Sequence, residues 1–240
     1  MSNVELLSFT DAQALAQAAA NQWVKALERQ LPREAPFCVA LSGGRIARRF
    51  FEAVVCEVKH RSCLAFNSVH FFWADERCVP PQDPESNFGL ACRTLFAPLH
   101  TPESNIHRVR GEDQPELAAT QAEAQLRRVA RVSVGRHSVL DLIFLGMGED
   151  GHVASLFPVE SAAAMTPEAS YRAVSSPKPP PWRITLGYQA IAVASEVWVL
   201  ASGEGKENAL RESLAPGGGT PLARVLSLRT HTKIFTDIRK

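Results

Sequence analysis

Short apolar runs alternate with helix-like segments along most of the sequence, and this alternation constrains the fold more than any other feature. The runs have the length of buried strands, and they lie at 37–41, 69–73, 140–145, 171–174, 183–186, 196–201 and 233–235. Apolar residues recur at helical spacing over 10–31, 45–58, 87–99, 115–132, 188–194, 206–214 and 221–228. This order predicts an α/β fold with an open, mostly parallel, Rossmann-like sheet and helices on both of its faces.

Two stretches have the composition of linkers, the proline-rich 175–181 and the glycine run 217–219. The alternation of strands and helices continues past both, so we interpret them as surface loops and expect residues 1–240 to form a single domain. Thr10 and Gln13 have the spacing of a capping box, with Thr10 as the residue that starts the first helix. Residues 74–86 are polar and are expected to form a loop.

The charge balance and the cysteines exclude several classes of function. The formal net charge is +1, so the chain lacks the broad basic field that nucleic-acid binding requires. No run reaches the ~18 apolar residues of a membrane span, and the first residues do not resemble an export signal, so we expect a cytoplasmic protein. The five cysteines include no Cys-x-x-Cys pair, which argues against a disulfide framework and a zinc site.

Four glycine-bearing or charged segments each follow a predicted strand, at 42–44, 75–77, 146–152 and 203–206. Ligands bind at the carboxyl ends of the strands in open parallel sheets. If the four strands are neighbours in the sheet, these segments meet at one edge. The sequence therefore predicts a single site to which all four contribute.

Residues 146–151 match the glycine pattern of dinucleotide-binding turns. That function also needs an acidic residue about 20 positions further on, at the end of a second strand, and none stands there. Glu149 and Asp150 would moreover repel a pyrophosphate. We therefore interpret the segment as a turn that presents His152 at the start of a short helix. A carboxylate beside His152 would fix its tautomer, and the residues leave open whether Asp75 or Asp150 does so.

Cations and a glycine turn supply the other half of the predicted site. Ser42, Gly43 and Gly44 join a strand to a helix, where free N–H groups attract an anion. Arg183 opens a strand and Lys206 lies in a glycine-rich turn, and each alone is typical of a solvated surface cation. Together with the turn at Ser42 they would form a phosphate clamp.

At these residues the sequence resembles the 6-phosphogluconolactonase family, whose superfamily includes the glucosamine-6-phosphate deaminases. The resemblance rests on 41–44, 73–80 with 86–87, and 145–158, and it continues through 183–186 and 205–206. It implies the hydrolysis of 6-phospho-D-glucono-1,5-lactone to 6-phospho-D-gluconate, the second step of the oxidative pentose phosphate pathway. It implies no metal and no cofactor.

On this resemblance His152 is the general base, and Asp75 or Asp150 orients it. Arg77 and the N–H groups of the turn containing Gly146 and Gly148 would stabilise the oxyanion. The residues expected to bind substrate are Ser42, Gly43, Gly44, Arg45, Gly146, Gly148, Arg183 and Lys206. The family's glycine turn usually continues with Thr-Pro or Ser-Pro, whereas Arg45, Ile46 and Ala47 follow here, so Arg45 would supply a cation.

Two other functions compete with the lactonase. The deaminases typically have Ala-Phe-Asn-Glu-Pro after the histidine and Asp-Glu-Tyr at the earlier motif, whereas this chain has 154–158 as Ala-Ser-Leu-Phe-Pro and Arg77. A catalytically silent sugar-phosphate sensor would not need a base such as His152 beside acids. The sequence leaves the oligomeric state open and is compatible with a monomer.

Overall fold

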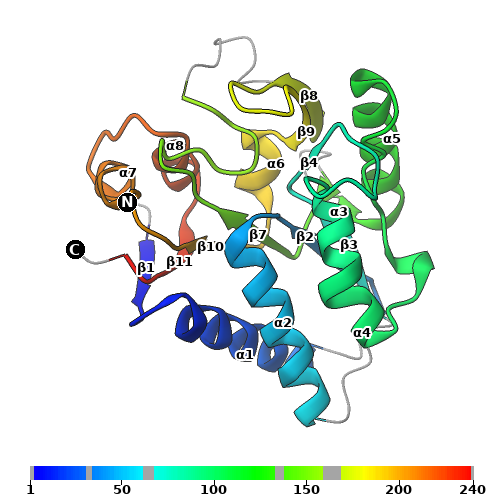
Figure 1. Ribbon diagram of the computed structural model, residues 1–240, viewed down its shortest axis with the longest axis horizontal. Coiled ribbons are helices and arrows are strands. Elements are labelled where there is room, and N and C mark those ends of the chain that lie inside the picture. The colour runs from blue at the N-terminus through cyan, green and yellow to red at the C-terminus, as the bar shows by residue number, and fades with distance from the viewer. Residues whose placement is uncertain (1–2, 31–33, 62–67, 133–137, 159–168, 239–240) are drawn as a thin grey trace.

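A sheet of six parallel strands forms the centre of the protein, in the order β1-β11-β10-β7-β2-β3 (Figure 1). The computed structural model describes residues 3–30, 34–61, 68–132, 138–158 and 169–238. The strands of this sheet are β1 (Asn3–Ser8), β2 (Phe37–Leu41), β3 (Val69–Trp73), β7 (Leu142–Gly146), β10 (Glu196–Ala201) and β11 (His231–Thr236). The predicted open parallel sheet is confirmed.

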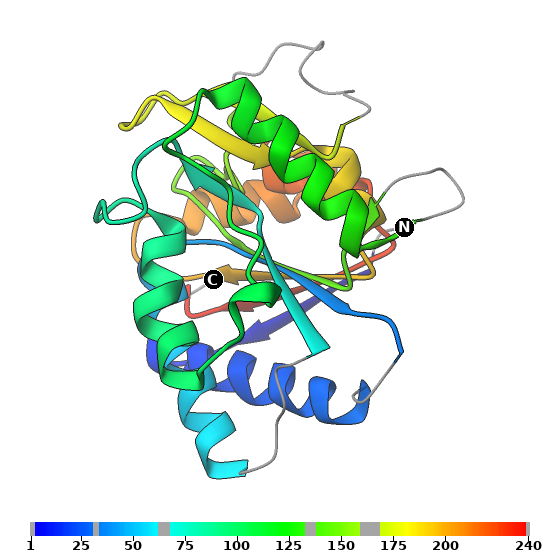
Figure 2. The same ribbon diagram turned by 90° about the vertical axis from the view of Figure 1, so that its right-hand side faces the viewer.

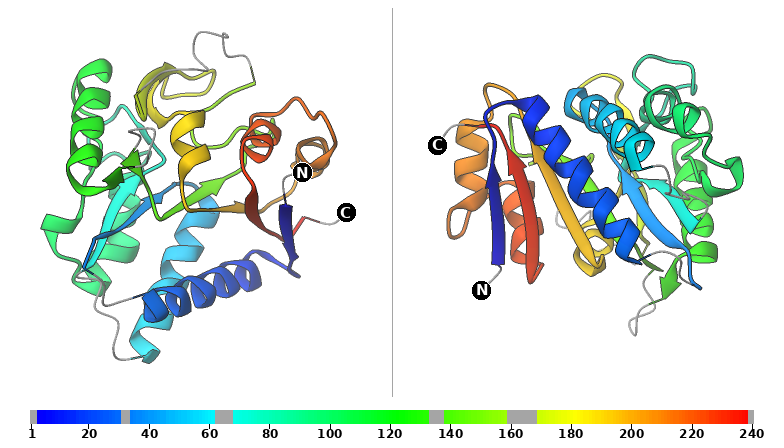
Figure 3. Two further views of the ribbon diagram at one scale, coloured as in Figure 1. Left: turned by 180° about the vertical axis from the view of Figure 1, so that it is seen from behind. Right: turned by 90° about the horizontal axis from the view of Figure 1, so that it is seen from below.

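Helices cover both faces of this sheet. Helices α1 (Ala12–Gln30) and α2 (Arg45–Arg61) pack together and lie across one face, as the right-hand view of Figure 3 shows. Helices α5 (Pro115–Val129), α6 (Tyr188–Val193) and α8 (Pro221–Ser227) lie on the other side (Figure 2). Helix α7 (Glu207–Leu214) contacts α8.

Aromatic side chains join α1 and α2 to the middle of the sheet. The ring of Phe144 on β7 lies 4.5 Å from that of Phe50 and 5.1 Å from that of Trp23, measured between centroids. Trp198 on β10 continues the cluster at 5.7 Å from Phe144. All four side chains are buried, and pairs of this kind contribute about 0.5–1.5 kcal/mol beyond the area they bury. The cluster therefore fixes α1 and α2 against the sheet, and α2 is the helix that follows the Ser42 turn.

A second, antiparallel sheet was not predicted. It contains β4 (Asp75–Arg77), β9 (Trp182–Leu186) and β8 (Tyr171–Ser175), in that order. The expectation of a loop over 74–86 was wrong at its start, because Asp75, Glu76 and Arg77 pair with β9. Three charged residues carry no apolar pattern, and only backbone pairing with a distant segment makes them a strand.

The boundaries of some helices differ from the predicted ones where local hydrogen bonds compete with the predicted pattern. Helix α1 starts after Asp11 and not after Thr10, because Asp11 Oδ1 accepts from the N–H groups of Gln13 and Ala14, both at 2.9 Å. The helix expected over 87–99 consists of α3 (Asn87–Ala91), a π-helical turn (Cys92–Phe96) and α4 (Ala97–Leu99). The predicted end of the first helix at residue 31 lies outside the described residues.

Short elements complete the described chain. They are the 3-10 turn Glu103–Asn105 and the antiparallel pair of β5 (Arg131–Val132) with β6 (Ser138–Val139). The helix expected over 115–132 therefore ends at Val129, and the chain turns into β5. Edge strand β1 was also missed, because its side chains are all at least partly exposed and carry no buried pattern.

Candidate active site

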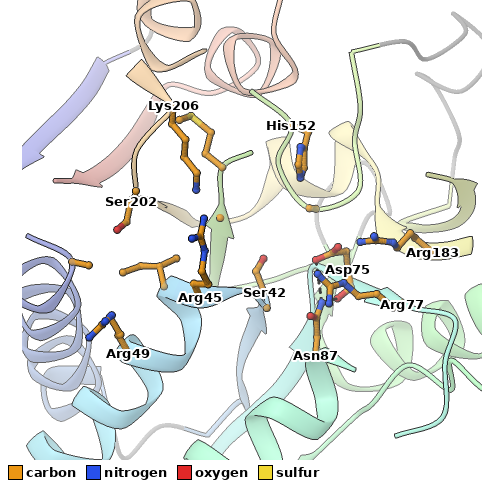
Figure 4. A pocket seen from close by; sticks show the side chains of 18 residues that line it. Ser42, Arg45, Arg49, Asp75, Arg77, Asn87, His152, Arg183, Ser202 and Lys206 are labelled. Carbon is orange, nitrogen blue, oxygen red and sulfur yellow. Dashed lines mark hydrogen bonds between the residues drawn. The ribbon is translucent and has the colours of Figure 1, made fainter. Parts of the chain in front are cut away.

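A pocket of about 340 Å³ lies at the carboxyl ends of β2, β3, β7 and β10 (Figure 4). These four strands are neighbours in the sheet, and their ends are level, since Leu41 is the register partner of Trp73 and Leu200 that of Gly146. Each is followed by one of the four predicted segments. The expected single site at this edge is therefore present.

Most of the predicted site residues line this pocket. They are Ser42, Gly43, Gly44, Arg45, Asp75, Arg77, Gly146, His152, Arg183 and Lys206. Gly148 and Asp150 do not line it and instead pack against the imidazole of His152. Arg49, Asn87 and Ser202 line the pocket as well and were not assigned a role from the sequence. Asn87 belongs to the Ser86-Asn87 pair of the family motif, which was the signal for it.

His152 is held by the turn that carries it. Its Nδ1 donates to Asp150 Oδ1, which also accepts from the backbone N–H of His152 at 3.3 Å. Nδ1 is thereby engaged, so Nε2 is the ring nitrogen free to act on a ligand in the neutral form. Partial burial would raise the pKa of Asp150, but the hydrogen bond and charge of His152 outweigh it and lower that pKa. Lys178 lies 3.7 Å from the other carboxylate oxygen of Asp150.

The turn has no helix after His152, so the expected short helix was wrong. The Gly148 N–H donates to the carbonyl of His152 at 2.9 Å, and Val153 forms an isolated bridge with Leu156. The Gly148 N–H is thus engaged within the turn and does not face a ligand. A Cβ on Gly148 would stand 2.0 Å from His152 Nδ1, so this position requires glycine. Gly148 therefore leaves room for the imidazole to pack against the turn.

Asp75 has a different task from Asp150. It is buried, and its Oδ2 accepts from Ser155 Oγ at 2.7 Å. Its backbone carbonyl accepts from the Asn87 amide at 2.8 Å. Within the described contacts Asp75 makes no hydrogen bond with His152. Asp75 therefore ties the wall of the pocket to the segment after His152, while Asp150 orients the imidazole.

The Ser42 turn presents backbone groups to one side of the pocket. Ser42 Oγ donates to the carbonyl of Phe144 at 2.8 Å, so this hydroxyl links β2 to β7. Gly44 has a φ of +95°, which lets the chain turn into α2. The first N–H groups of a helix lack partners within it, and those of α2 open at the pocket. This side of the site suits an anion.

Two cations stand beside that turn. Arg45 and Lys206 lie close together on this side of the pocket (Figure 4). Burial lowers the pKa of Lys206, and the charge of Arg45 lowers it further. The repulsion between like charges held together in this way is relieved when an anion binds between them.

Arg77 and Arg183 form a second cationic group across the pocket (Figure 4). They are direct register partners on β4 and β9, a placement that is unfavourable for like charges. Arg183 is buried, and burial and Arg77 together lower its pKa. Its Nε and Nη2 donate to the carbonyls of Pro180 and Pro179 at 3.2 and 3.1 Å. The structure thus separates Arg183 from Lys206, which were expected to form one clamp.

The described residues contain neither a metal-binding cluster nor a membrane-spanning helix. Over the described ranges no three His, Cys, Asp or Glu side chains are placed to hold a metal ion together. Among these ranges no helix is both long and apolar enough to span a membrane. The described cysteines, Cys38, Cys56, Cys78 and Cys92, are free thiols.

Comparison with known proteins identifies the family. The model of the glucosamine-6-phosphate isomerase/6-phosphogluconolactonase family matches residues 10–235. The chain belongs to this family. It is 34% identical over 206 residues to the 6-phosphogluconolactonase of Haemophilus influenzae, which covers 86% of this chain and 84% of that protein. The family match over residues 10–235 includes all four segments of the site.

Solved structures agree with the assigned fold. A 6-phosphogluconolactonase from Shewanella baltica superposes with a TM-score of 0.84 at 25% identity, covering 98% of this chain and 97% of that one. A monomeric glucosamine-6-phosphate deaminase superposes with a TM-score of 0.78 at 17% identity, over 97% of this chain and 96% of that one. At that identity the second likeness concerns the fold alone.

Proposed function

We propose that the protein hydrolyses 6-phospho-D-glucono-1,5-lactone to 6-phospho-D-gluconate, the second step of the oxidative pentose phosphate pathway. The observation that carries the proposal is the Asp150-oriented imidazole of His152 between two cationic groups. A phosphorylated lactone needs a dianion site and, at a distance from it, a base and a site for the developing oxyanion. This pocket offers both.

The phosphate fits the side formed by Arg45, Lys206 and the N–H groups after Ser42. Backbone N–H groups at a helix start bind phosphate oxygens, Lys206 acts as a point charge and Arg45 as a planar fork. This assignment replaces the clamp of Arg183 with Lys206, since those two lie on opposite sides. The lactone ring then extends toward His152.

The carbonyl end fits the side formed by Arg77 and Arg183. His152 Nε2 takes a proton from a water molecule as the water oxygen attacks C1. The guanidinium of Arg77, with Arg183 beside it, stabilises the oxyanion of the tetrahedral intermediate. Protonated His152 then gives its proton to the departing ring oxygen, and Asp150 stabilises the imidazolium in between. The bond from C1 to the ring oxygen breaks, and the carboxylic acid forms.

The experiment that tests this function uses freshly prepared lactone, with acid release followed directly. Glucosamine 6-phosphate is tested in parallel for ammonia release. Lactone turnover well above the spontaneous rate supports the proposal. Ammonia release without lactone turnover would identify a deaminase, and tight binding of 6-phosphogluconate without any turnover would identify a sensor.

Three further expectations belong to this proposal. The protein works in the cytoplasm, it needs no metal or cofactor, and residues 1–240 form one domain. The measured molar mass in solution would decide its oligomeric state.

A further inference from the structure

Glu76 is a buried carboxyl group next to the site that the mechanism does not use. It stands between Asp75 and Arg77 on β4, whose side chains line the pocket. Side chains alternate along a strand, so Glu76 points to the opposite side, and it is only 2% exposed. A buried carboxylate is costly unless hydrogen bonds compensate for its lost hydration.

The carboxylate of Glu76 accepts hydrogen bonds from backbone N–H groups of two segments. Its Oε1 accepts from Arg77 N at 2.7 Å and from Asn87 N at 2.8 Å. Its Oε2 accepts from Phe88 N at 2.7 Å and from Ser86 Oγ at 3.3 Å. The ionised carboxylate of Glu76 therefore binds the start of α3 to β4. No other side chain among the described residues takes these three N–H groups.

Of the residues that Glu76 binds, Arg77 and Asn87 line one wall of the pocket. The Asn87 amide donates to the Asp75 carbonyl at 2.8 Å, and Asp75 in turn holds Ser155. The Asn87 side chain also lies against Gly43, since a Cβ there would come within 1.7 Å of Asn87 Oδ1. A movement of Asn87 is thus transmitted to the Ser42 turn and to the segment after His152.

We infer that Glu76 is a positioning residue for the reaction: its ionised carboxylate holds Arg77 and Asn87 in place at the pocket, and its protonation releases them. The inference rests on the proposed function. A protonated carboxyl carries a donor on one oxygen, so it cannot accept all the bonds that the anion accepts. The wall of the site is therefore ordered only in the ionised state.

Burial of Glu76 places the titration of its carboxyl group near neutral pH. Burial raises the pKa of Glu76 to about 7, against the effect of the Phe88, Asn87 and Arg77 N–H groups. Asp75 on the same strand raises it further. On β9 the register partner of Glu76 is the uncharged Ile184, while Arg183 lies on the pocket side opposite Arg77 and interacts with Glu76 only through its charge. Helix α3 presents only uncharged donors. The neighbouring thiol of Cys78 has its own pKa raised to about 11, so it stays neutral.

The test compares the parent with Glu76→Gln and Glu76→Asp from pH 5.5 to 7.5, where the lactone survives long enough for assay. Glu76→Gln keeps the shape and replaces an acceptor with a donor. At pH 7.5 we expect it to lower kcat/KM about tenfold, because it leaves a buried donor unpaired. At pH 5.5 we expect hardly any loss, because the carboxyl group of the parent is itself protonated there. Glu76→Asp keeps the charge and retains the pH dependence of the parent, at a lower rate. The ratio of parent to Glu76→Gln cancels any pH dependence that the two proteins share.

A ratio that stays constant with pH would overturn the inference, because a purely structural loss does not depend on ionisation. The double variant Glu76→Gln/Asn87→Ala should lose less activity at pH 7.5 than the product of the two single losses, since both changes act on the same wall. Losses that multiply would also overturn it.

Stability supplies a readout that is independent of activity. The folded-state pKa of about 7 lies above the ordinary carboxyl value, so the unfolded chain releases its proton first as pH rises. As the pH rises from 5 to 7.5, the melting temperature of the parent should fall relative to that of Glu76→Gln. Over the same range the kcat/KM of the parent should rise relative to that of the variant. A parallel pH dependence of both melting temperatures contradicts the inference. If the lactone is not turned over at all, the proposed function fails, while this measurement still reports on Glu76.

Discussion

His152 Nδ1 donates a hydrogen bond to the carboxylate of Asp150, two residues earlier in the same turn. The sequence offered two carboxylates for this task, and the other one, Asp75, instead accepts from Ser155 Oγ. The closer residue along the chain therefore orients the base, and the more distant one builds the wall. The two acids consequently have separable effects on catalysis.

Replacing the base should abolish most of the activity without loss of binding. We expect His152→Ala to lower kcat by about 100-fold or more, because general base and general acid assistance are both removed. KM should change little, since the cations that bind the phosphate remain. Steady-state kinetics on the phosphorylated lactone provide the measurement. His60→Ala, an exposed histidine at the end of α2, is the matched control and should match the parent.

The two acids can be told apart by paired amide substitutions. Asp150→Asn should lower kcat by about tenfold or more, because the imidazolium loses its counter-charge, with little change in melting temperature. Asp75→Asn should lower the melting temperature as well, since Asp75 is buried and its carboxylate accepts from Ser155. Kinetics combined with thermal melts separate the two. A full-rate Asp150→Asn enzyme would show that Asp150 does not support the base.

Phosphate recognition can be isolated with a substrate that lacks the phosphate. Lys206→Ala should raise KM for the phosphorylated lactone by roughly 10- to 100-fold, the range for a lost hydrogen bond to a charged group. The effect on D-glucono-1,5-lactone should be far smaller. Lys59→Ala, exposed on the far end of α2, serves as the control. Equal losses on both lactones would place the phosphate elsewhere.

Gly43 offers a steric test of the pocket wall. A Cβ at Gly43 would come within 1.7 Å of Asn87 Oδ1, so Gly43→Ala should displace Asn87 and lower kcat/KM strongly. Gly217→Ala is the control: its φ is +74°, but open space surrounds the added Cβ. It should cost about 1–2 kcal/mol of stability from backbone strain and leave activity intact. Normal activity of Gly43→Ala would show that Asn87 can move freely.

A histidine pair away from the pocket, with His107 buried and His70 half-buried, should make the fold sensitive to acid. His70 Nδ1 and His107 Nε2 lie 2.8 Å apart, and burial together with their mutual charge lowers the pKa of His70. Burial also lowers the pKa of His107. The unfolded chain then takes up protons first as pH falls, so stability is full above about pH 6.5 and is lost below it.

Thermal melts between pH 7.5 and 5 measure this effect. Replacing His70 with Phe should flatten the pH dependence of the melting temperature, whereas His60→Ala should leave it as in the parent. An unchanged slope in the His70→Phe variant would assign the acid sensitivity to other groups.

Much of the fold and most of the pocket were predictable because they follow from local signals. The apolar runs at 37–41, 69–73 and 196–201 became strands with the same bounds, since a run with four or five buried residues leaves little alternative. The edge at which four segments meet follows from parallel strands with level ends. Ten of the twelve predicted site residues line the pocket for the same reason.

Other features depend on residues far apart in the sequence. Strand β4 has no pattern of its own and exists because β9, about 100 residues later, pairs with it. That pairing also sets Arg77 opposite Arg183 and thereby separates Arg183 from Lys206. The role of Glu76 could not be predicted for the same reason, because the donors that its carboxylate accepts from reach it only through the loop that brings Ser86 and Asn87 back to β4.

The sequence by itself determined the sheet, its edge and the turn that presents His152, because periodicity and glycine positions act over short distances. Which carboxylate orients His152, which cations share a side and what holds the wall of the pocket were decided only by the tertiary structure. Each of these depends on the distance between segments that are far apart in the sequence. Hydrogen bonds and charges act over a few ångströms, and the spacing of residues along the chain does not give these distances.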